Sequence, residues 1–276
     1  MIRIVVDSAS DVPYNNSENI AVVPLSVTIN GKTYLDGYEL GHNEFYDMLT
    51  KTEAFPKTSQ PSPEDFTKVF ETAKKDGDEI ICILLSSGVS GTYQSACLAK
   101  NLVDYEGIHV IDSLTGAYGV YLLVQEAQKL IKENYSAKEI AVRIEELKSR
   151  VMVFLSVDTL EYLYRGGRLS KTSALIGGVA KIKPVIRVTE EGTIGVYNKQ
   201  IGMSRAMKAL ADVAKEYPVD TDHSFYTIYT AGTHNIEMFE DKLKENSVDI
   251  TERVQLGPVV GTHLGPEAFG MIYIRK

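Results

Sequence analysis

The sequence predicts an α/β protein of two domains, and three observations lead to this prediction. In the first half, short apolar runs, polar loops and amphipathic segments alternate, which is typical of parallel strands joined by helices on both faces of a sheet. Beyond about residue 150, pairs of strands mix with helices, as in an α+β domain. The 276 residues suffice for two domains of ordinary size. We therefore predict an N-terminal parallel-sheet, three-layer domain over residues 1–155 and a C-terminal α+β domain over residues 156–276.

The first half opens on an apolar run at residues 2–6, which predicts a buried parallel strand. A second run at 22–29 contains Pro24 and predicts an edge strand, because proline cannot donate to a strand ladder. The apolar run at 79–85 predicts the central strand. Ser62 followed by Pro63 is typical of a helix start. The other elements predicted here are helices over 43–50, from residue 92 to about 102, 116–133 and 137–150, a strand over 108–111, and a polar loop over 57–61.

The second half begins with a strand at 151–157. Apolar segments at 184–189 and 193–197 flank Glu190-Glu191-Gly192, which predicts a β-hairpin. The other elements predicted here are a short helix near 158–164, helices near 204–216 and 235–246, strands at 225–230, 253–256 and 271–275, and a loop over 257–270.

Composition excludes several classes of protein. Lys and Arg total 29 against 37 Asp and Glu, a net charge of −8, and no basic run stands out, so the chain lacks the charge of a nucleic-acid binder or of a protein bound to anionic membranes. The two cysteines are too few for a disulfide framework or a thiolate metal site. We find no secretory signal and no apolar stretch of membrane-spanning length, and we expect a soluble, cytoplasmic protein.

Residues 86–92, Ser-Ser-Gly-Val-Ser-Gly-Thr, form the strongest local motif for a binding site, because they join the predicted central strand to a helix. Ligands of open parallel sheets bind outside the carboxyl ends of the strands, where glycines allow close approach and free N–H groups attract anions. The alternative is that Ser90 or Thr92 only caps the following helix.

Catalytic templates match this loop poorly. Thr92 stands where a nucleophile elbow has its last glycine, no P-loop lysine is present, and the dinucleotide-binding glycine pattern is absent. A nucleophilic pair of Ser90 and His263 stays open from the residues alone. The five histidines show no metal-ligand spacing, so no metal site is predicted.

Three further positions carry groups able to bind an anion, each with a structural alternative. Thr58 and Ser59 supply hydroxyls in a loop ahead of a helix, which by itself predicts only a turn. Arg168, in Arg-Gly-Gly-Arg, is able to hold a phosphate or carboxylate or to end a helix. His263, among glycines, is a hydrogen-bond donor, a general base or a surface residue.

Together these loops resemble the DegV family of bacterial fatty-acid-binding proteins. The matching segments, in chain order, are Asp7-Ser8-Ala9-Ser10-Asp11, Thr58-Ser59-Gln60-Pro61-Ser62, Ser86-Ser87-Gly88-Val89-Ser90-Gly91-Thr92-Tyr93, Gly166-Gly167-Arg168-Leu169-Ser170, Ile182-Lys183-Pro184 and Gly261-Thr262-His263-Leu264-Gly265-Pro266. They cover essentially the whole chain.

The resemblance implies a long-chain fatty acid held between the two domains, with its tail buried in the second. It also implies a non-enzymatic carrier, the lipid-presenting subunit of a fatty acid kinase, whose separate ATP-dependent subunit phosphorylates the bound carboxylate for phospholipid synthesis. No cofactor is implied beyond the bound acid. By motif position Thr58, Ser90 and His263 look like the carboxylate-binding groups, with Ser59 and Arg168 as further candidates.

Two alternatives remain at the level of sequence. The apolar stretch of Ala174, Leu175, Ile176, Val179 and Ala180 lines the tail, or it is ordinary core packing. The rival function is a serine hydrolase that acts on lipid esters through Ser90 and His263.

Overall fold

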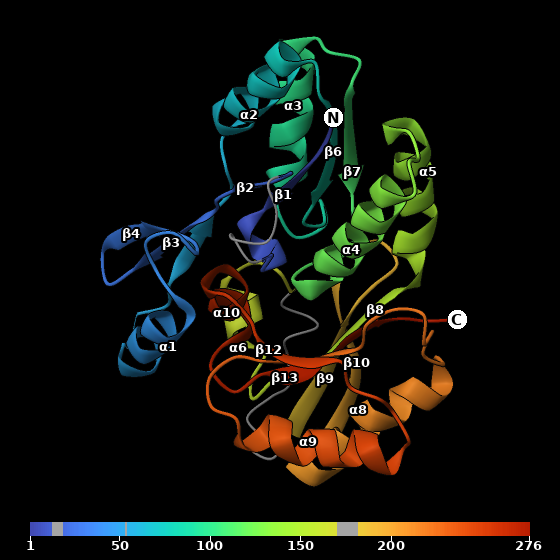
Figure 1. The fold of residues 1–276 in the computed structure, drawn as a ribbon. Coiled ribbons are helices and arrows are strands. Elements are labelled where there is room, and N and C mark those ends of the chain that lie inside the picture. The colour runs from blue at the N-terminus through green and yellow to red at the C-terminus, as the bar shows by residue number, and fades with distance from the viewer. Residues whose placement is uncertain (13–18, 53, 170–181) are drawn as a thin grey trace.

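The computed structural model describes residues 1–12, 19–52, 54–169 and 182–276. The apolar stretch at 174–180 lies outside these residues. The described chain forms a parallel sheet, a larger mixed sheet and a small third sheet (Figure 1). Within the described ranges, no helix combines the length and apolar content needed to cross a membrane.

The N-terminal sheet is parallel throughout and has the strand order β2-β1-β6-β7. Its strands are β1 (Ile2–Asp7), β2 (Ile20–Val23), β6 (Glu79–Leu84) and β7 (Ile108–Asp112). Helices α2 (Pro63–Asp76) and α3 (Thr92–Val103) cover one face, and α4 (Tyr118–Lys132) and α5 (Ala137–Leu147) cover the other (Figure 1). On β6, Ile80 and Cys82 pack against α2 and α3, whereas Ile81 and Ile83 pack against α4 and α5. The predicted parallel three-layer arrangement is confirmed.

The predicted start of helix α2 is also present. The Ser62 hydroxyl accepts from the Asp65 N–H at 3.3 Å, and the Asp65 carboxylate accepts in return from the Ser62 N–H at 2.9 Å. Such a reciprocal pair satisfies N–H groups that have no partner within the helix. It fixes where α2 begins after the small third sheet.

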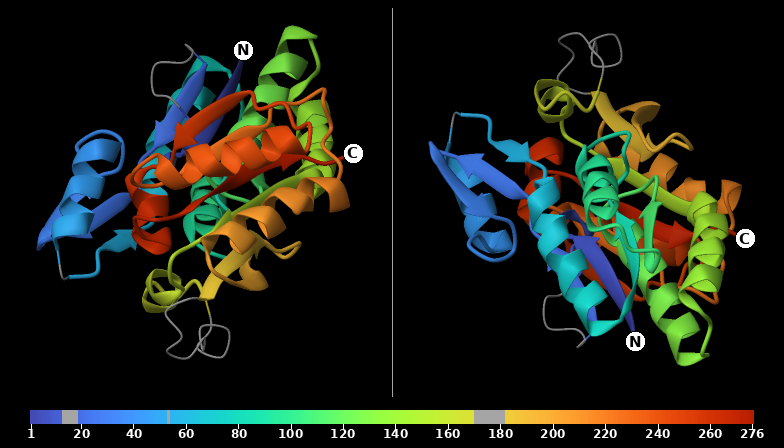
Figure 2. Two further views of the ribbon diagram at one scale, coloured as in Figure 1. Left: turned by 90° about the horizontal axis from the view of Figure 1, so that it is seen from below. Right: turned by 90° about the horizontal axis from the view of Figure 1, so that it is seen from above.

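The C-terminal sheet has six strands in the order β10-β9-β8-β13-β11-β12. They are β8 (Val151–Ser156), β9 (Ile182–Val188), β10 (Ile194–Ile201), β11 (Tyr226–Tyr229), β12 (Glu252–Gln255) and β13 (Phe269–Ile274). Only β11 and β12 pair in parallel, so the sheet is mixed, and β9 and β10 form the predicted hairpin. Helices α8 (Met203–Glu216) and α9 (His234–Glu245) cover one face (Figure 2, left). The other face packs toward the N-terminal sheet and α4.

The third sheet corrects two predictions. It has the order β4-β3-β5 and, with α1 (His42–Lys51), lies to one side of the molecule in both views of Figure 2. The run at 22–29 is not one edge strand, because Pro24 separates β2 from β3 (Ser26–Ile29), which pairs with β4 (Lys32–Leu35). The predicted polar loop at 57–61 contains β5 (Lys57–Ser59), which also pairs with β3. A strand of three polar residues has no apolar alternation, and only its pairing partner reveals it.

The predicted loop at 257–270 is also wrong in part, because it contains α10 (Pro258–Leu264). A helix of seven residues with Gly261 inside it shows no clear helical periodicity. Its Val259 packs with Leu25, Val27 and Phe45 of the N-terminal half. Helix α10 also contacts the short helix α6 (Glu161–Arg165) and β5. This helix of the C-terminal half is thus embedded among N-terminal elements.

Candidate functional site

A cavity lies between the carboxyl end of the N-terminal sheet and the inner face of the C-terminal sheet. It encloses about 840 Å³ of space, its opening to solvent included. Most of its wall is apolar. The C-terminal sheet contributes Val153, Leu155, Ile186, Val188, Ile194, Ile228 and Ile272, and the N-terminal half contributes Ala9, Leu25, Leu85 and Ala117.

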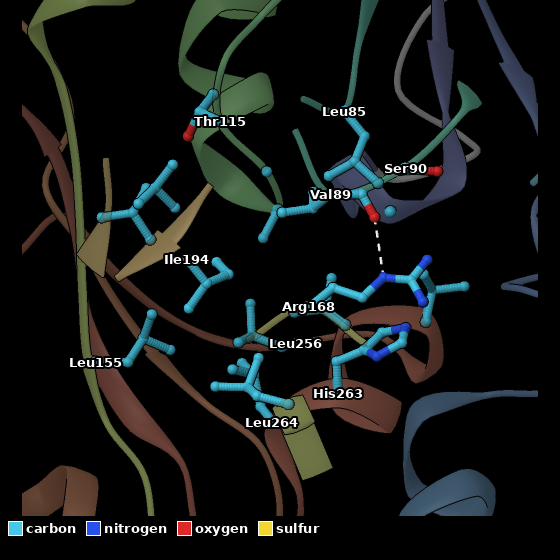
Figure 3. Close-up of a pocket in the computed structure, with 18 of the residues that line it drawn as sticks. Leu85, Val89, Ser90, Thr115, Leu155, Arg168, Ile194, Leu256, His263 and Leu264 are labelled. Carbon is cyan, nitrogen blue, oxygen red and sulfur yellow. Dashed lines mark hydrogen bonds between the residues drawn. The ribbon is translucent and has the colours of Figure 1, made fainter. Parts of the chain in front are cut away.

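Polar side chains gather at one end of this cavity. Thr58, Ser90, Arg168 and His263 all line it, and they come from four separate segments of the chain. In Figure 3, Arg168 and His263 lie together on one side, and Leu155 lies on the opposite side. The cavity therefore has a polar end and an apolar end, as an amphipathic ligand requires.

His263, on α10, is a neutral hydrogen-bonding group. Its Nε2 lies 2.9 Å from the Thr58 hydroxyl, and its Nδ1 is buried with no partner among the described residues. Burial, and then the positive charge of Arg168, lowers the pKa of the imidazole to about 3. The ring fits because residue 166 is glycine, since a Cβ on Gly166 would stand 2.2 Å from Nδ1.

Among the described residues at the polar end, Arg168 brings a positive charge into the cavity. Its Nε donates to the Val89 carbonyl at 2.9 Å (Figure 3), and its Nη1 donates to the Gly166 carbonyl at 2.6 Å. Burial lowers the pKa of the guanidinium, but arginine stays charged in proteins. These bonds use two of its five N–H groups, and no other described residue accepts from the remaining three.

Ser90 lies in the loop between β6 and α3, as the sequence predicts. Its Oγ lies 2.9 Å from Thr92 Oγ1, and its N–H donates to the Ser86 carbonyl at 3.1 Å. The loop is held against the C-terminal half by Ser86, whose hydroxyl donates to the Gly192 carbonyl at 2.7 Å in the β9–β10 hairpin. Ser90 is thus fixed relative to both walls of the cavity.

Four of the five site residues named from sequence meet at this end, and one does not. Ser59 is exposed on β5, where it pairs with Ser26, and it does not line the cavity. Sequence reasoning missed the apolar wall, although its members alternate along strands, as Val153 and Leu155 do on β8. That alternation marks an inner face but does not say whether it packs or encloses a cavity.

The geometry does not support a serine hydrolase. His263 Nε2 bonds to Thr58 rather than to Ser90, whose hydroxyl bonds to Thr92. No described carboxylate orients the imidazole, and a group with a pKa of about 3 is a weak general base near neutral pH. In the described part of the chain, no group of three His, Cys, Asp or Glu side chains is placed to hold a metal ion.

Comparison with known proteins agrees with this arrangement. The family model "Uncharacterised protein, DegV family" matches residues 1–276. A DegV domain-containing protein from Caldanaerobacter subterraneus subsp. tengcongensis is 38% identical over 280 residues, covering 100% of this chain and 99% of that protein. A fatty acid binding DegV family protein from Streptococcus agalactiae superposes with a TM-score of 0.92 at 29% identity, covering 100% of this chain and 99% of its own.

A stearic acid-binding protein from Eubacterium ventriosum also superposes over 100% of this chain and 99% of its own, with a TM-score of 0.85 and 29% identity. The similarity therefore extends over both sheets and over every segment that lines the cavity. This chain belongs to the DegV family.

Proposed function

We propose that the chain binds a long-chain fatty acid in this cavity, with the carboxylate at the polar end and the tail along the apolar wall. The polarity of the cavity carries this proposal, because one end is polar and most of the remaining wall is apolar. A tail buried along such a wall gains about 0.8 kcal/mol per CH₂. Fatty acid binding by the structurally similar proteins from Streptococcus agalactiae and Eubacterium ventriosum supports it.

The proposed carboxylate site combines neutral donors with one guanidinium. A lone pair without a donor is tolerated better than a buried N–H without an acceptor, so we assign the His263 proton to Nε2, and Nδ1 carries the lone pair. Nε2–H then donates to Thr58, and the Thr58 hydroxyl hydrogen is free to donate to the ligand. The Ser90 hydroxyl and the free N–H groups of Arg168 complete the set.

The proposal extends to a partner. The bound carboxylate is presented, in the cytoplasm, to a separate kinase subunit that uses ATP. A carboxylate oxygen attacks the γ-phosphorus, ADP leaves, and an acyl phosphate forms. Neutral donors suit this role, because a hydrogen-bonded carboxylate keeps more of its nucleophilicity than one locked in several salt bridges.

Lipid extraction tests the binding step. Protein purified under native conditions is extracted with organic solvent, and the extract is analysed by mass spectrometry. We expect a long-chain fatty acid in equimolar amount, and we expect delipidated protein to take up palmitate. An extract without fatty acid, together with failed uptake, contradicts the proposal.

Reconstitution tests the kinase step separately. Palmitate-loaded protein is incubated with ATP and candidate kinase subunits from the same genome, and hydroxylamine traps any acyl phosphate as the hydroxamate. We expect hydroxamate that depends on one of these subunits and on ATP. If palmitate binds but no subunit yields hydroxamate, the carrier role fails and the binding role stands.

A further inference from the structure

Two carboxyl groups from the N-terminal half hold the start of α10, the helix that carries His263. The Gly257 N–H donates to Asp11 Oδ1 at 3.0 Å, although 246 residues separate the two in the chain. The Val259 N–H donates to the carboxylate of Asp36. The hydroxyl of Tyr46, on α1, donates to the Leu256 carbonyl at 2.8 Å just before the helix. Helix α10 is thus tied at its first turn to three separate N-terminal segments.

These bonds supply the hydrogen-bond acceptors that α10 lacks within its own sequence. The first N–H groups of a helix have no partner inside it, and the N-cap of α10 is Gly257, which has no side chain to provide one. Pro258 has no N–H, so Gly257 and Val259 are the first donors at this end. Both are taken by carboxyl groups, whose oxygens accept from them.

The carboxyl groups are costly to keep at this place. Asp36 is 2% exposed, and Asp11 Oδ2 is buried without a partner among the described residues. Burial, and then the neighbouring Asp36, raises the pKa of Asp11 well above its ordinary value, and burial raises that of Asp36 to about 6. Apolar side chains would avoid this desolvation penalty, but they would leave the N–H groups at the start of α10 without an acceptor.

The C-terminal end of α10 carries His263, whose position in the cavity matters for the ligand. His263 lies in the last turn, with its ring between the Thr58 hydroxyl and Gly166. A helix of seven residues is about 10 Å long and moves as one rigid piece. A displacement of the first turn therefore moves the imidazole and breaks a contact of 2.9 Å to Thr58.

We propose that Asp11 is a positioning residue of the fatty acid site, which sets α10 so that His263 Nε2 meets the Thr58 hydroxyl. This inference rests on the proposed function for its effect on binding. The position and protonation of the His263 imidazole are properties of the ligand-free protein, so they are measured independently of the proposed function.

The test compares Asp11→Ala, Asp11→Asn and Asp78→Ala in the full chain. Asparagine keeps an acceptor for the Gly257 N–H, whereas alanine removes it. Asp78 pairs with the N-terminal ammonium and Arg3 at the amino end of the parallel sheet, away from the cavity, so its loss controls for reduced stability. Palmitate affinity of delipidated protein is one readout. The ¹⁵N signals of the histidine side chains, assigned with His263→Gln, are the other.

We expect wild-type His263 to remain a neutral Nε2–H tautomer from pH 5 to pH 8. Asp11→Ala should let this imidazole titrate within that range and should weaken palmitate binding about tenfold, because the displaced imidazole no longer holds the Thr58 hydroxyl toward the head group. Asp11→Asn should restore both properties. If Asp11→Ala does not fold, Asp11→Ser, whose shorter side chain does not reach the Gly257 N–H, carries the same expectation.

The proposal is overturned if Asp11→Ala leaves the His263 signals and the palmitate affinity unchanged. It is also overturned if Asp78→Ala, at equal loss of stability, changes both in the same way. A wild-type protein that binds no palmitate refutes the proposed function. The His263 signals then still decide whether Asp11 positions the imidazole.

Discussion

A buried imidazole beside a guanidinium is a neutral hydrogen-bonding group, and His263 takes this state in the cavity. Its pKa of about 3, lowered by burial and then by Arg168, leaves Arg168 as the positive charge at the polar end. The whole chain carries a net charge of −8, which would repel an anion at long range. Hydrogen-bond donors at the polar end attract the anion more strongly than the net charge repels it. The reason is that short-range hydrogen bonds in a site shielded from water are stronger than screened charges at a distance.

The hydroxyl of Ser90 should matter for the ligand, and that of Ser59 should not. Ser90 lines the cavity, whereas Ser59 is exposed outside it. Ser90→Ala should weaken palmitate binding about tenfold, since one donor to a charged group is lost. Ser59→Ala is the matched control and should bind like wild type in the same titration. Equal affinities for the two variants would remove Ser90 from the site.

Stability should depend on pH through Asp7, which is fully buried below the loop that carries Ser90. Its carboxylate accepts from the Leu85 and Ala9 N–H groups, yet burial raises its pKa from 3.8 to about 7. Between these values the native state binds a proton that the unfolded chain releases. The contribution of Asp7 to the free energy of unfolding is therefore present below about pH 4 and falls as pH rises toward 7.

Urea unfolding of wild type and Asp7→Asn from pH 4 to pH 7.5 measures this contribution. Asparagine does not titrate, so the variant should lose less stability than wild type as pH rises. Asp78→Asn is the control. Hydrogen bonding to the N-terminal ammonium lowers the pKa of Asp78, so the contribution of Asp78 to stability changes with pH in the opposite direction. A difference between wild type and Asp7→Asn that does not change with pH would show that Asp7 is ionised throughout.

At the scale of elements, α6 and α10 approach each other only because residue 166 has no side chain. Gly166 has φ −71° and ψ −11°, which alanine adopts freely, so the contact with His263 is the main obstacle to Gly166→Ala, and the Tyr162 carbonyl, 3.0 Å from the added Cβ, is a smaller one. This variant should displace the imidazole and weaken palmitate binding by an order of magnitude or so, as loss of a well-placed partner does. Gly41→Ala, where a Cβ would meet nothing within 4 Å, should bind like wild type. Normal palmitate titration by Gly166→Ala would show that the imidazole has more room than the structure indicates.

The elements also differ in how far sequence predicts them. The start of α2 is encoded within four residues, from Ser62 to Asp65, and is confirmed in detail. Helix α10 has Pro258 at its first position but no capping side chain, and its N–H groups are satisfied by Asp11 and Asp36 from the other half of the chain. Local patterns predict elements that are stabilised locally, and they miss elements that depend on distant partners.

At the scale of the whole molecule, the distance between the two sheets sets the room for a tail. Leu155 on β8 lies across the cavity from His263 (Figure 3). Leu155→Phe should shorten the space and disfavour longer acids, by about 0.8 kcal/mol for each CH₂ that no longer fits. Titration with laurate and stearate should show stearate weakened more than laurate. Met152→Phe, on the opposite face of the same strand, should change neither, and an equal effect of both variants would contradict a tail along Leu155.

The boundary between the two halves remains a prediction at residue 155. The six-stranded sheet takes its first strand, β8, from Val151 onward, and α10 returns from the C-terminal half to pack on N-terminal elements. Both halves therefore line the cavity, and elements of each half pack against elements of the other.

The sequence by itself determined the parallel sheet, the hairpin and the loop that carries Ser90, because apolar periodicity and glycine placement act over a few neighbouring residues. It also named Thr58, Arg168 and His263 as candidate site residues through resemblance to a family. Only the tertiary structure decided that Thr58 meets His263 across 205 residues of chain, that Ser59 faces outward, and that the imidazole is neutral. Burial and the spacing of distant segments set these properties, and both arise only when the sheets pack together.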